Sequence, residues 1–491
     1  MDALVYTLGD KIATPEQIAI IEAAVRTKDN LLISALAGAA KTSTLELICK
    51  YMPVQPILSI AFNKRIAEEM AKRLPGHVQC STINSIGHRV WMKACSRRLV
   101  LDTKKSYNLL SLTVKSLAKK KQDEAYEDFS ETLKLVAHAK LNGYIPDGVA
   151  PHVKRLITSE HYWGSLEEEA SDLQIHLVNE VLSENIKLSY AGTIDFNDQI
   201  YMPTLFGGTF PKFPLIMVDE AQDLSPLNHA MLKKLVTERF IAVGDPWQSI
   251  YGFRGAVHAG MSHLQRDYSM REMPLSISFR CPIKIVERAR FRAPHMQWPQ
   301  WAKEGHVEQL KEWTANSIPD GSAIICRNNA PLFSCALRLL RSGRGIQLVG
   351  SDLGPGLVRI LKKLGPEHLK RDEVHASISR WEADRLRKAR SEGPVRDRAD
   401  CLRVFASFGD TLGAAIAYAE RLFTSAGPIQ LLSGHKAKGL EFETVFFLDP
   451  WRVPSKYATT PEQIEQEENV KYVIITRAKQ NLFFVNLEDL L

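Results

Sequence analysis

The stretch that most constrains this chain runs from residue 31 to residue 44 and reads LLISALAGAAKTST. Leu and Ile dominate its first six residues, which predicts a buried strand. The Gly/Ala-rich residues 35–40 predict a turn before a helix that opens at Lys41 and Thr42. In such a turn, small residues let backbone N–H groups close around phosphate oxygens, while a lysine reaches the β and γ phosphates and a hydroxyl binds Mg²⁺. The stretch therefore predicts a phosphate-binding loop in an α/β fold.

The match to the phosphate-loop pattern is incomplete. The pattern GxxxxGK followed by Ser or Thr expects glycine at positions 35 and 40, and both hold alanine. Taken alone, the stretch also fits an alanine-rich strand-to-helix turn with an exposed lysine. Other parts of the sequence have to decide between these interpretations.

A second apolar strand, Leu215–Val218, is followed directly by Asp219 and Glu220. Two carboxylates at the end of such a strand are costly to bury unless they meet a cation. Asp219 is therefore predicted to hold the Mg²⁺ of a nucleotide, and Glu220 to orient and deprotonate an attacking water. Together with Lys41 and Thr42 they predict the two halves of an NTPase site, a pairing far more specific than either half.

Residues 14–17, Thr-Pro-Glu-Gln, predict the start of a helix with Thr14 as its cap and Gln17 closing a capping box. The alternative interpretation places the Gln17 amide against an adenine edge, because an amide offers both a donor and an acceptor. The residues leave both roles open.

Two further strands are predicted at 57–61 and 78–81. Open α/β sheets bind ligands at the carboxyl ends of their strands, which is where these strands deliver polar and basic residues. The alternative is a capped surface turn at each end. The residues concerned are Phe62, Asn63, Lys64 and Thr82.

The loop that follows the predicted strand 240–243 mixes an amide, aromatic residues and an arginine. Aromatic faces interleaved with cations suit stacking on unpaired bases, worth about 1 to 3 kcal/mol per base. Packing of Tyr251 and Phe253 in a core is the alternative. The side chains concerned are Trp247, Gln248, Tyr251, Phe253 and Arg254.

Strand and helix patterns predict two α/β cores, each interrupted by a helical insertion. The predicted limits are 1–91 and 191–270 for the first core, 92–190 for its insertion, 271–362 and 424–491 for the second core, and 363–423 for its shorter insertion. The first insertion carries a run of Lys and Arg, including Lys105. This run either contacts a phosphate backbone or forms a solvated helix face.

Composition excludes several classes of protein. The seven cysteines form no CxxC pair and the histidines no metal-ligand spacing, which argues against a disulfide framework and against zinc or iron–sulfur sites. No signal peptide or long apolar run is found, so no membrane association is expected. The net charge of +7 permits a polyanionic partner. We expect a bacterial or phage-encoded protein that works in a reducing cytoplasm and is associated with the nucleoid.

Nine motifs occur in the order found in superfamily 1 DNA helicases of the UvrD/Rep/PcrA type, and over residues 14–479 the chain resembles that family. They are TPEQ, AGAAKT, AFNKR, STINS, VDEAQD, GDPWQSIYGFRGA, SFR, HKAKGLEFETV and YVIITRAK. The sixth and eighth are especially similar to the F-box DNA helicase branch, although no F-box segment is recognised. The resemblance implies two RecA-like P-loop NTPase cores that use ATP and Mg²⁺.

The resemblance also implies roles for individual residues. Gln17 would recognise adenine, Phe279 would stack on it where the family usually has Tyr, and Glu441 would hold the ribose. Gln248 would sense the γ phosphate, and Arg280 and Arg477 would act as arginine fingers. The phosphate loop would comprise Ala37, Gly38, Ala39, Ala40, Lys41, Thr42 and Ser43.

On the DNA side, the resemblance implies 3′→5′ travel on single-stranded DNA and separation of partly duplex DNA. The segments lining the strand would include Phe62, Asn63, Lys64, Thr82, Tyr251, Phe253, Arg254 and His435. One alternative is a DNA-stimulated ATPase subunit of a repair, phage or anti-phage-defence complex, with a protein partner and little unwinding alone. A non-catalytic nucleic-acid-binding module is another, and RNA is an alternative track.

Ala40 departs from the family pattern. Its methyl group would strain the turn if φ were positive, at a cost on the order of 1 kcal/mol. We expect ATP hydrolysis to survive, because every chemical group of the site is retained.

Overall fold

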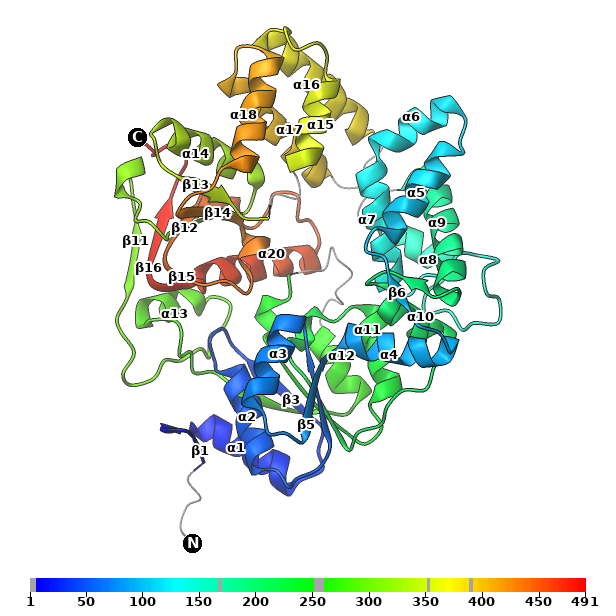
Figure 1. Ribbon diagram of the computed structural model, residues 1–491. Helices are drawn as coiled ribbons and strands as arrows, with labels where there is room; N and C mark the ends of the chain where they lie inside the picture. The colour runs from blue at the N-terminus through cyan, green and yellow to red at the C-terminus, as the bar shows by residue number, and fades with distance from the viewer. Residues whose placement is uncertain (1–5, 167–169, 251–259, 351–353, 388–391) are drawn as a thin grey trace. The chain divides into compact units, whose positions relative to one another are not determined.

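The computed structural model describes residues 6–491 except 167–169, 251–259, 351–353 and 388–391 (Figure 1). Among the residues described, the chain divides into two compact units, Met1–Ser276 and Ile277–Leu491. Each unit is built around its own parallel sheet, and the α/β class predicted from the sequence is confirmed.

The first unit holds, in its described part, a six-stranded parallel sheet with the order β10-β3-β9-β8-β4-β5. Alternate residues of each central strand pack on opposite faces, so that Leu31 and Ile33 enter one core cluster and Leu32 another. Burial on both faces explains why these strands are almost continuously apolar. The strands are β3 (Leu31–Ala35), β4 (Ile57–Ala61), β5 (Val78–Thr82), β8 (Leu215–Val218), β9 (Arg239–Gly244) and β10 (Arg271–Leu275).

The helices of the first unit form two groups. The group associated with the sheet comprises α1 (Pro15–Arg26), α2 (Lys41–Tyr51), α3 (Lys64–Arg73), α4 (Ile83–Cys95), α10 (Asp198–Phe206), α11 (Pro226–Leu235) and α12 (Gly260–Asp267). The second group gathers beside α4 and α10 (Figure 1) and comprises α5 (Lys105–Lys115), α6 (Lys119–Glu127), α7 (Phe129–Leu141), α8 (Ser159–Gly164) and α9 (Asp172–Tyr190). This second group has an apolar core of its own.

A buried ionic cluster of Lys105, Lys140, Asp195 and Asp198 joins these helices. Lys105 Nζ donates to Asp198 Oδ2 at 2.8 Å, and Lys140 Nζ donates to Asp195 Oδ2 and Asp198 Oδ1, both at 2.7 Å. Lys105 also donates to Asn185 and Ser189 of α9. Lys105 is therefore buried, and neither interpretation of the basic run, DNA contact or solvated face, is right for this residue.

The second unit contains, among its described residues, a six-stranded parallel sheet with the order β11-β16-β15-β12-β14-β13. The strands are β11 (His306–Gln309), β12 (Ala323–Cys326), β13 (Ile346–Leu348), β14 (Ile429–Ser433), β15 (Phe442–Leu448) and β16 (Ala478–Val485). The helices that accompany it are α13 (Ile283–Ala289), α14 (Asn329–Arg341), α19 (Gly434–Ala437) and α20 (Pro461–Ile475).

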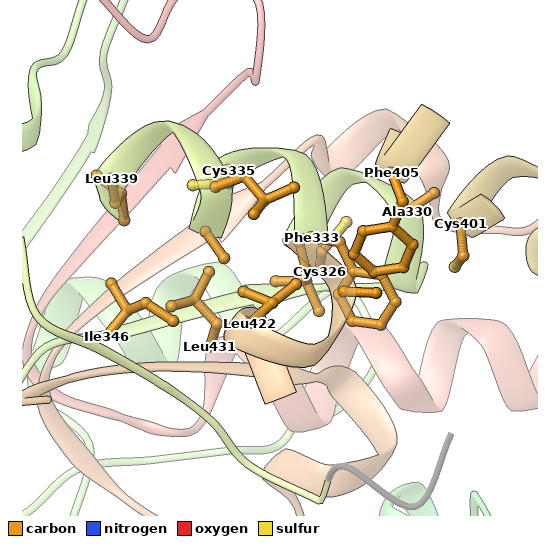
Figure 2. Close-up of a cluster of buried hydrophobic side chains, with 14 of the residues drawn as sticks. Cys326, Ala330, Phe333, Cys335, Leu339, Ile346, Cys401, Phe405, Leu422 and Leu431 are labelled. Atoms are coloured by element: carbon orange, nitrogen blue, oxygen red, sulfur yellow. The ribbon is translucent and has the colours of Figure 1, made fainter. Parts of the chain in front are cut away.

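The remaining helices of the second unit are α15 (Gly354–Lys363), α16 (Arg371–Leu386), α17 (Glu392–Phe408) and α18 (Leu412–Thr424). They share one continuous core with the sheet. Figure 2 shows Phe405 of α17 beside Phe333 of α14, and Leu422 of α18 near Leu431 of β14. The ring centroids of Phe405 and Phe333 lie 5.6 Å apart. Helices α15–α18 are thus packed against the α/β core of the second unit.

The predicted start of the second core at residue 271 is too early, because strand β10 belongs to the first sheet. Residues 271–275 pair in parallel with β3 of the first sheet, and the compact first unit extends to Ser276. The segment is short and contains a proline, so its sequence does not show which sheet it joins. The limits of the two helical insertions stay predictions.

Candidate active site

The carboxyl ends of three adjacent strands, β3, β9 and β8, form the candidate active site of the first unit. They are followed by Lys41 on α2, by Asp245, and by Asp219 and Glu220. Lys41 Nζ lies 2.7 Å from Glu220 Oε1, so residues 179 positions apart form an ion pair. The two predicted halves of the site therefore meet at one point.

The phosphate loop contains backbone in the left-handed region. Gly38 has φ 76° and Ala40 has φ 56° and ψ 40°. The Ala40 carbonyl accepts from the Thr44 N–H at 3.0 Å and from Thr44 Oγ1 at 3.1 Å, and these bonds hold the strained residue at the start of α2. The φ angle of Ala40 is therefore positive, and its methyl group strains the turn.

Glu220 is a second left-handed residue, with φ 53°. Its N–H donates to Asp219 Oδ1 at 2.8 Å, and its carbonyl accepts from the Asp223 N–H at 3.1 Å. Strain of this kind costs about 1 to 3 kcal/mol and gathers at functional sites. Lys41 and Glu220 form the ion pair. Left-handed backbone thus occurs at Glu220 itself and at Ala40, the residue before Lys41.

The electrostatics of the site follow from burial. Burial and the adjacent charge of Glu220 raise the pKa of Asp219 to about 6, against the opposing effect of Lys41. Burial likewise raises the pKa of Asp245 to about 6. Burial favours a lower pKa for Lys41, but the nearby carboxylates outweigh it and raise that pKa. We call Lys41, Asp219, Glu220 and Asp245 the active-site cluster.

The active-site cluster fits a divalent cation. It holds one ammonium group and three carboxylates, so a bound cation would balance the excess negative charge. The raised pKa values of Asp219 and Asp245 arise chiefly from burial. Mg²⁺ prefers oxygen ligands and is commonly held by one or two carboxylates together with substrate phosphates. Asp219 and the Thr42 hydroxyl, in the first turn of α2, are suitable ligands.

Gln17 forms the predicted capping box with Thr14. Its Oε1 accepts from the Thr14 N–H at 3.0 Å, and its Nε2 donates to Thr44 Oγ1 at 3.0 Å. Through Thr44 the Gln17 side chain is linked to the carbonyl of Ala40. The helix-start interpretation is confirmed, while adenine recognition by Gln17 stays a prediction.

Gln248 is buried, and its Nε2 donates to Asp245 Oδ2 at 2.7 Å. Sequence reasoning missed the residue that joins this pair to the active site. Gln222 donates to Glu220 Oε2 at 2.6 Å and accepts from the Asp245 N–H at 3.0 Å. Its place in the motif DEAQD was the available signal.

Three predicted residues of the second unit, Arg280, Glu441 and Arg477, lie near one another. Arg280 Nε lies 2.6 Å from Glu441 Oε2, and Arg477 donates to the carbonyl of Leu440, the neighbour of Glu441. Arg477 is 1% exposed and also donates to the Val473 carbonyl at 2.9 Å. Their roles as arginine fingers and ribose ligand stay predictions.

Phe279 is half-exposed, and its ring centroid lies 6.1 Å from that of Trp301. The backbone joins the two segments, because the Ser278 N–H donates to the Gln297 carbonyl at 2.9 Å. The predicted stacking position is therefore an exposed aromatic pair, of which sequence reasoning identified one member.

Four of the predicted DNA contacts, Phe62, Asn63, Lys64 and Thr82, lie at the carboxyl ends of β4 and β5 in the first sheet. Phe62 is 57% exposed, Asn63 caps α3 and Thr82 caps α4, so the turns are capped as the alternative interpretation holds. Lys64 forms only an exposed ion pair with Glu68 among the described contacts. His435 lies on α19 in the second unit. Tyr251, Phe253 and Arg254 lie outside the described residues.

A further exposed aromatic residue was missed. Phe196 is 54% exposed, and its carbonyl accepts from Asn84 Nδ2 of α4 at 2.7 Å. It stands between Asp195 and Asp198 of the buried ionic cluster, which fixes its backbone. An aromatic residue between two aspartates was the signal in the sequence.

The chain matches known proteins over most of its length. Residues 14–269 match the family model described as the UvrD/REP helicase N-terminal domain, and residues 413–489 match the UvrD-like helicase C-terminal domain. F-box DNA helicase protein 1 of Schizosaccharomyces pombe is 26% identical over 96% of this chain and 57% of that protein. F-box DNA helicase 1 of Gallus gallus is 26% identical over 99% of this chain and 50% of that protein.

A bacterial relative covers less of the chain. ATP-dependent DNA helicase UvrD1 of Mycobacterium tuberculosis is 26% identical over 62% of this chain and 43% of that protein. The chain therefore spans about half the length of the curated relatives it matches. In the part of the chain that the structure describes, no helix combines the length and apolar character needed to cross a bilayer.

Proposed function

The chain belongs to the UvrD/REP helicase family, and we propose that it hydrolyses ATP to move 3′→5′ on single-stranded DNA and to separate duplex DNA. The observation that carries the proposal is the contact between Lys41 and Glu220, 2.7 Å apart with Asp219 adjacent. It unites a phosphate-binding lysine with a candidate general base at the carboxyl edge of a parallel sheet.

Lys41 and the loop 37–43 bind the nucleotide phosphates. In the described structure the ammonium group of Lys41 is engaged by Glu220. A phosphate that competes for this ammonium group releases Glu220 to accept a proton from water, as a general base. Bound Mg²⁺, held by Thr42 and Asp219, would neutralise phosphate charge.

The first unit also presents a surface suited to unpaired bases. Phe62 follows β4, and the Phe196 carbonyl is bonded to Asn84 at the start of α4, the helix that follows β5. Both exposed residues are therefore attached near the carboxyl ends of neighbouring strands of one sheet. Stacking on exposed aromatic rings binds single strands without sequence preference. Single-stranded DNA is therefore the proposed track, and Asn63, Lys64 and Thr82 border it.

A specific observation favours a second candidate, a DNA-stimulated ATPase with little unwinding activity of its own. Helices α15–α18 share their core with the second sheet, and arginines there are engaged by carboxylates, as Arg396 and Arg403 are by Glu382. Arginines that are paired with carboxylates inside the helical group are less available to bind duplex phosphates. A partner in a repair or defence complex would then complete the helicase.

The deciding experiment measures steady-state ATP hydrolysis with Mg²⁺, with and without single-stranded DNA, for the wild type and for Glu220→Gln. We expect strong stimulation by DNA and a loss of about 10²-fold or more in kcat for the variant, since general-base catalysis contributes about 10² to 10⁴. A strand-displacement assay with 3′ and 5′ overhangs then separates the helicase from the ATPase candidate. Absence of hydrolysis under both conditions would contradict the proposal and favour the non-catalytic binding module.

A further inference from the structure

Gln222 connects the candidate general base to the turn that carries Gln248. It belongs to the short helix η1 (Ala221–Asp223) and is 1% exposed. Its Nε2 donates to Glu220 Oε2 at 2.6 Å, and its Oε1 accepts from the Asp245 N–H at 3.0 Å. One buried side chain therefore spans the ends of β8 and β9.

The chemistry of both partners requires an amide at this position. A carboxylate can only accept and a backbone N–H can only donate, so the bridging group must donate at one end and accept at the other. A leucine has neither function, and a glutamate would place a second negative charge against Glu220. Hydrogen bonds to a charged partner are also the stronger kind.

Gly244 supplies independent evidence for this bridge. The φ angle of Gly244 is not positive, so its backbone conformation does not require glycine. A Cβ on Gly244 would overlap Gln222 Oε1 more closely than real Cβ atoms approach any neighbour, and it would also lie 3.0 Å from Met261 Sδ and 3.2 Å from the Ala221 nitrogen. Glycine at this position therefore provides the space that the Gln222 amide occupies.

The bridge continues into the following turn. Asp245 Oδ1 accepts from the Trp247 N–H at 3.0 Å and Asp245 Oδ2 from Gln248 Nε2 at 2.7 Å. Ser249 Oγ lies 3.5 Å from the Gln222 carbonyl oxygen. A continuous series of contacts thus runs from Lys41 through Glu220, Gln222 and Asp245 to Gln248.

From this geometry we propose that Gln222 is a positioning residue. It orients the Glu220 carboxylate and couples it to the turn 245–249, which leads in sequence into the predicted DNA-binding residues 251–254. The inference rests on the proposed ATPase function. Movement of the turn when DNA binds changes the position of the Asp245 N–H, and through the Gln222 amide changes the orientation of the base.

The first test compares Gln222→Leu, of similar size, with the wild type in ATP hydrolysis with and without a single-stranded oligonucleotide. We expect DNA-stimulated kcat to fall at least tenfold and the stimulation ratio to fall towards 1, while KM for ATP changes less than threefold. The matched control is Gln199→Leu, a buried glutamine on α10 whose described side-chain partner is His88, and it should retain the ratio.

The second test uses Gln222→Glu and the pH dependence of kcat. A carboxylate beside Glu220 raises the pKa of the base, so the acidic limb of the profile should shift to higher pH. A purely structural defect would lower kcat without moving this limb. The profile therefore remains informative if Gln222→Leu fails to fold.

The third test is a double-mutant cycle with Gly244→Ala, whose Cβ should displace the amide. If both changes act on the same bridge, the double variant with Gln222→Leu should lose no more activity than the worse single variant. Full additivity, or a stimulation ratio of Gln222→Leu within twofold of the wild type, would overturn the inference. Absence of DNA-stimulated hydrolysis in the wild type would instead refute the proposed function, so the two failures are distinguishable.

Discussion

Two clusters of buried or half-buried charge lie in the first unit, and they differ in charge balance. The ionic cluster of Lys105, Lys140, Asp195 and Asp198 contains two ammonium groups and two carboxylates. Burial opposes ionisation of Asp195, but Lys140 and the hydroxyl of Ser106 outweigh it and hold the pKa of Asp195 well below its usual range. This cluster is complete without a ligand and joins elements far apart in the sequence.

The active-site cluster also combines ammonium and carboxylate groups, but it has one ammonium group and three carboxylates. Three carboxylates face Lys41, and the pKa values of Asp219 and Asp245 are raised to about 6. The contrast teaches that a balanced buried cluster stabilises the fold, whereas an excess of one charge is characteristic of a site completed by a ligand of opposite charge.

The largest effect on stability is expected for a substitution that disrupts the ionic cluster of Lys105, Lys140, Asp195 and Asp198. Lys140→Met leaves Asp195 and Asp198 buried with one ammonium group fewer, and we expect a loss of about 3 to 5 kcal/mol in the free energy of unfolding, measured by urea denaturation. Lys119→Met, which removes an exposed pair with Asp123, is the matched control and should change stability by less than about 0.5 kcal/mol. Equal effects of the two substitutions would refute the structural role of the cluster.

The next prediction concerns opposite pH dependences. Because the pKa of Asp245 is raised in the folded state, its contribution to stability is present below the unfolded value of about 4 and is lost as pH rises through about 6. Asp245→Asn should therefore raise the unfolding free energy at pH 7.5 by on the order of 1 to 2 kcal/mol, and by a smaller amount at pH 5, which lies between the unfolded and the folded pKa values.

Asp195 has the opposite sign. Its lowered pKa means that its stabilisation is present above the unfolded value and is lost as pH falls below about 4. Asp195→Asn should cost about 1 to 3 kcal/mol at pH 7.5. Thermal unfolding in EDTA at both pH values checks the pair. Destabilisation by both substitutions at pH 7.5 would show that the active-site cluster is also balanced.

The smallest expected effect concerns Ala40. Ala40→Gly relieves the left-handed strain but adds conformational entropy to the unfolded chain, so stability should change by less than about 1 kcal/mol. We also expect kcat to change less than tenfold, because the bonds from Thr44 already hold the loop. A rise in kcat of tenfold or more would show that the native loop is impaired.

Local patterns predicted much of the fold and of the site. The strands at 57–61 and 215–218 are observed with those limits, because their apolar runs are buried on both faces of a sheet. Strands β11 and β14 were missed. The first is an exposed edge strand of four residues, and the second lies in the segment GPIQLLSG, where glycine, proline and polar residues surround a short apolar run.

The sequence by itself determined which polar and charged groups of the first unit lie at one edge of its sheet. Lys41, Thr42, Asp219 and Glu220 follow apolar strands, and in a parallel sheet the carboxyl ends of strands lie at one edge. The local spacing of residues therefore carried enough information to predict that these groups converge.

Only the tertiary structure decided which charges are paired. Lys105 stood in a basic run yet lies in the ionic cluster with Asp198, and strand β10 joined the first sheet although the sequence placed it in the second core. Gln222 became the bridge between Glu220 and Asp245 only because β8 and β9 are neighbours and Gly244 leaves room. Burial, strand order and side-chain partners depend on contacts between distant segments, and local sequence patterns do not contain them.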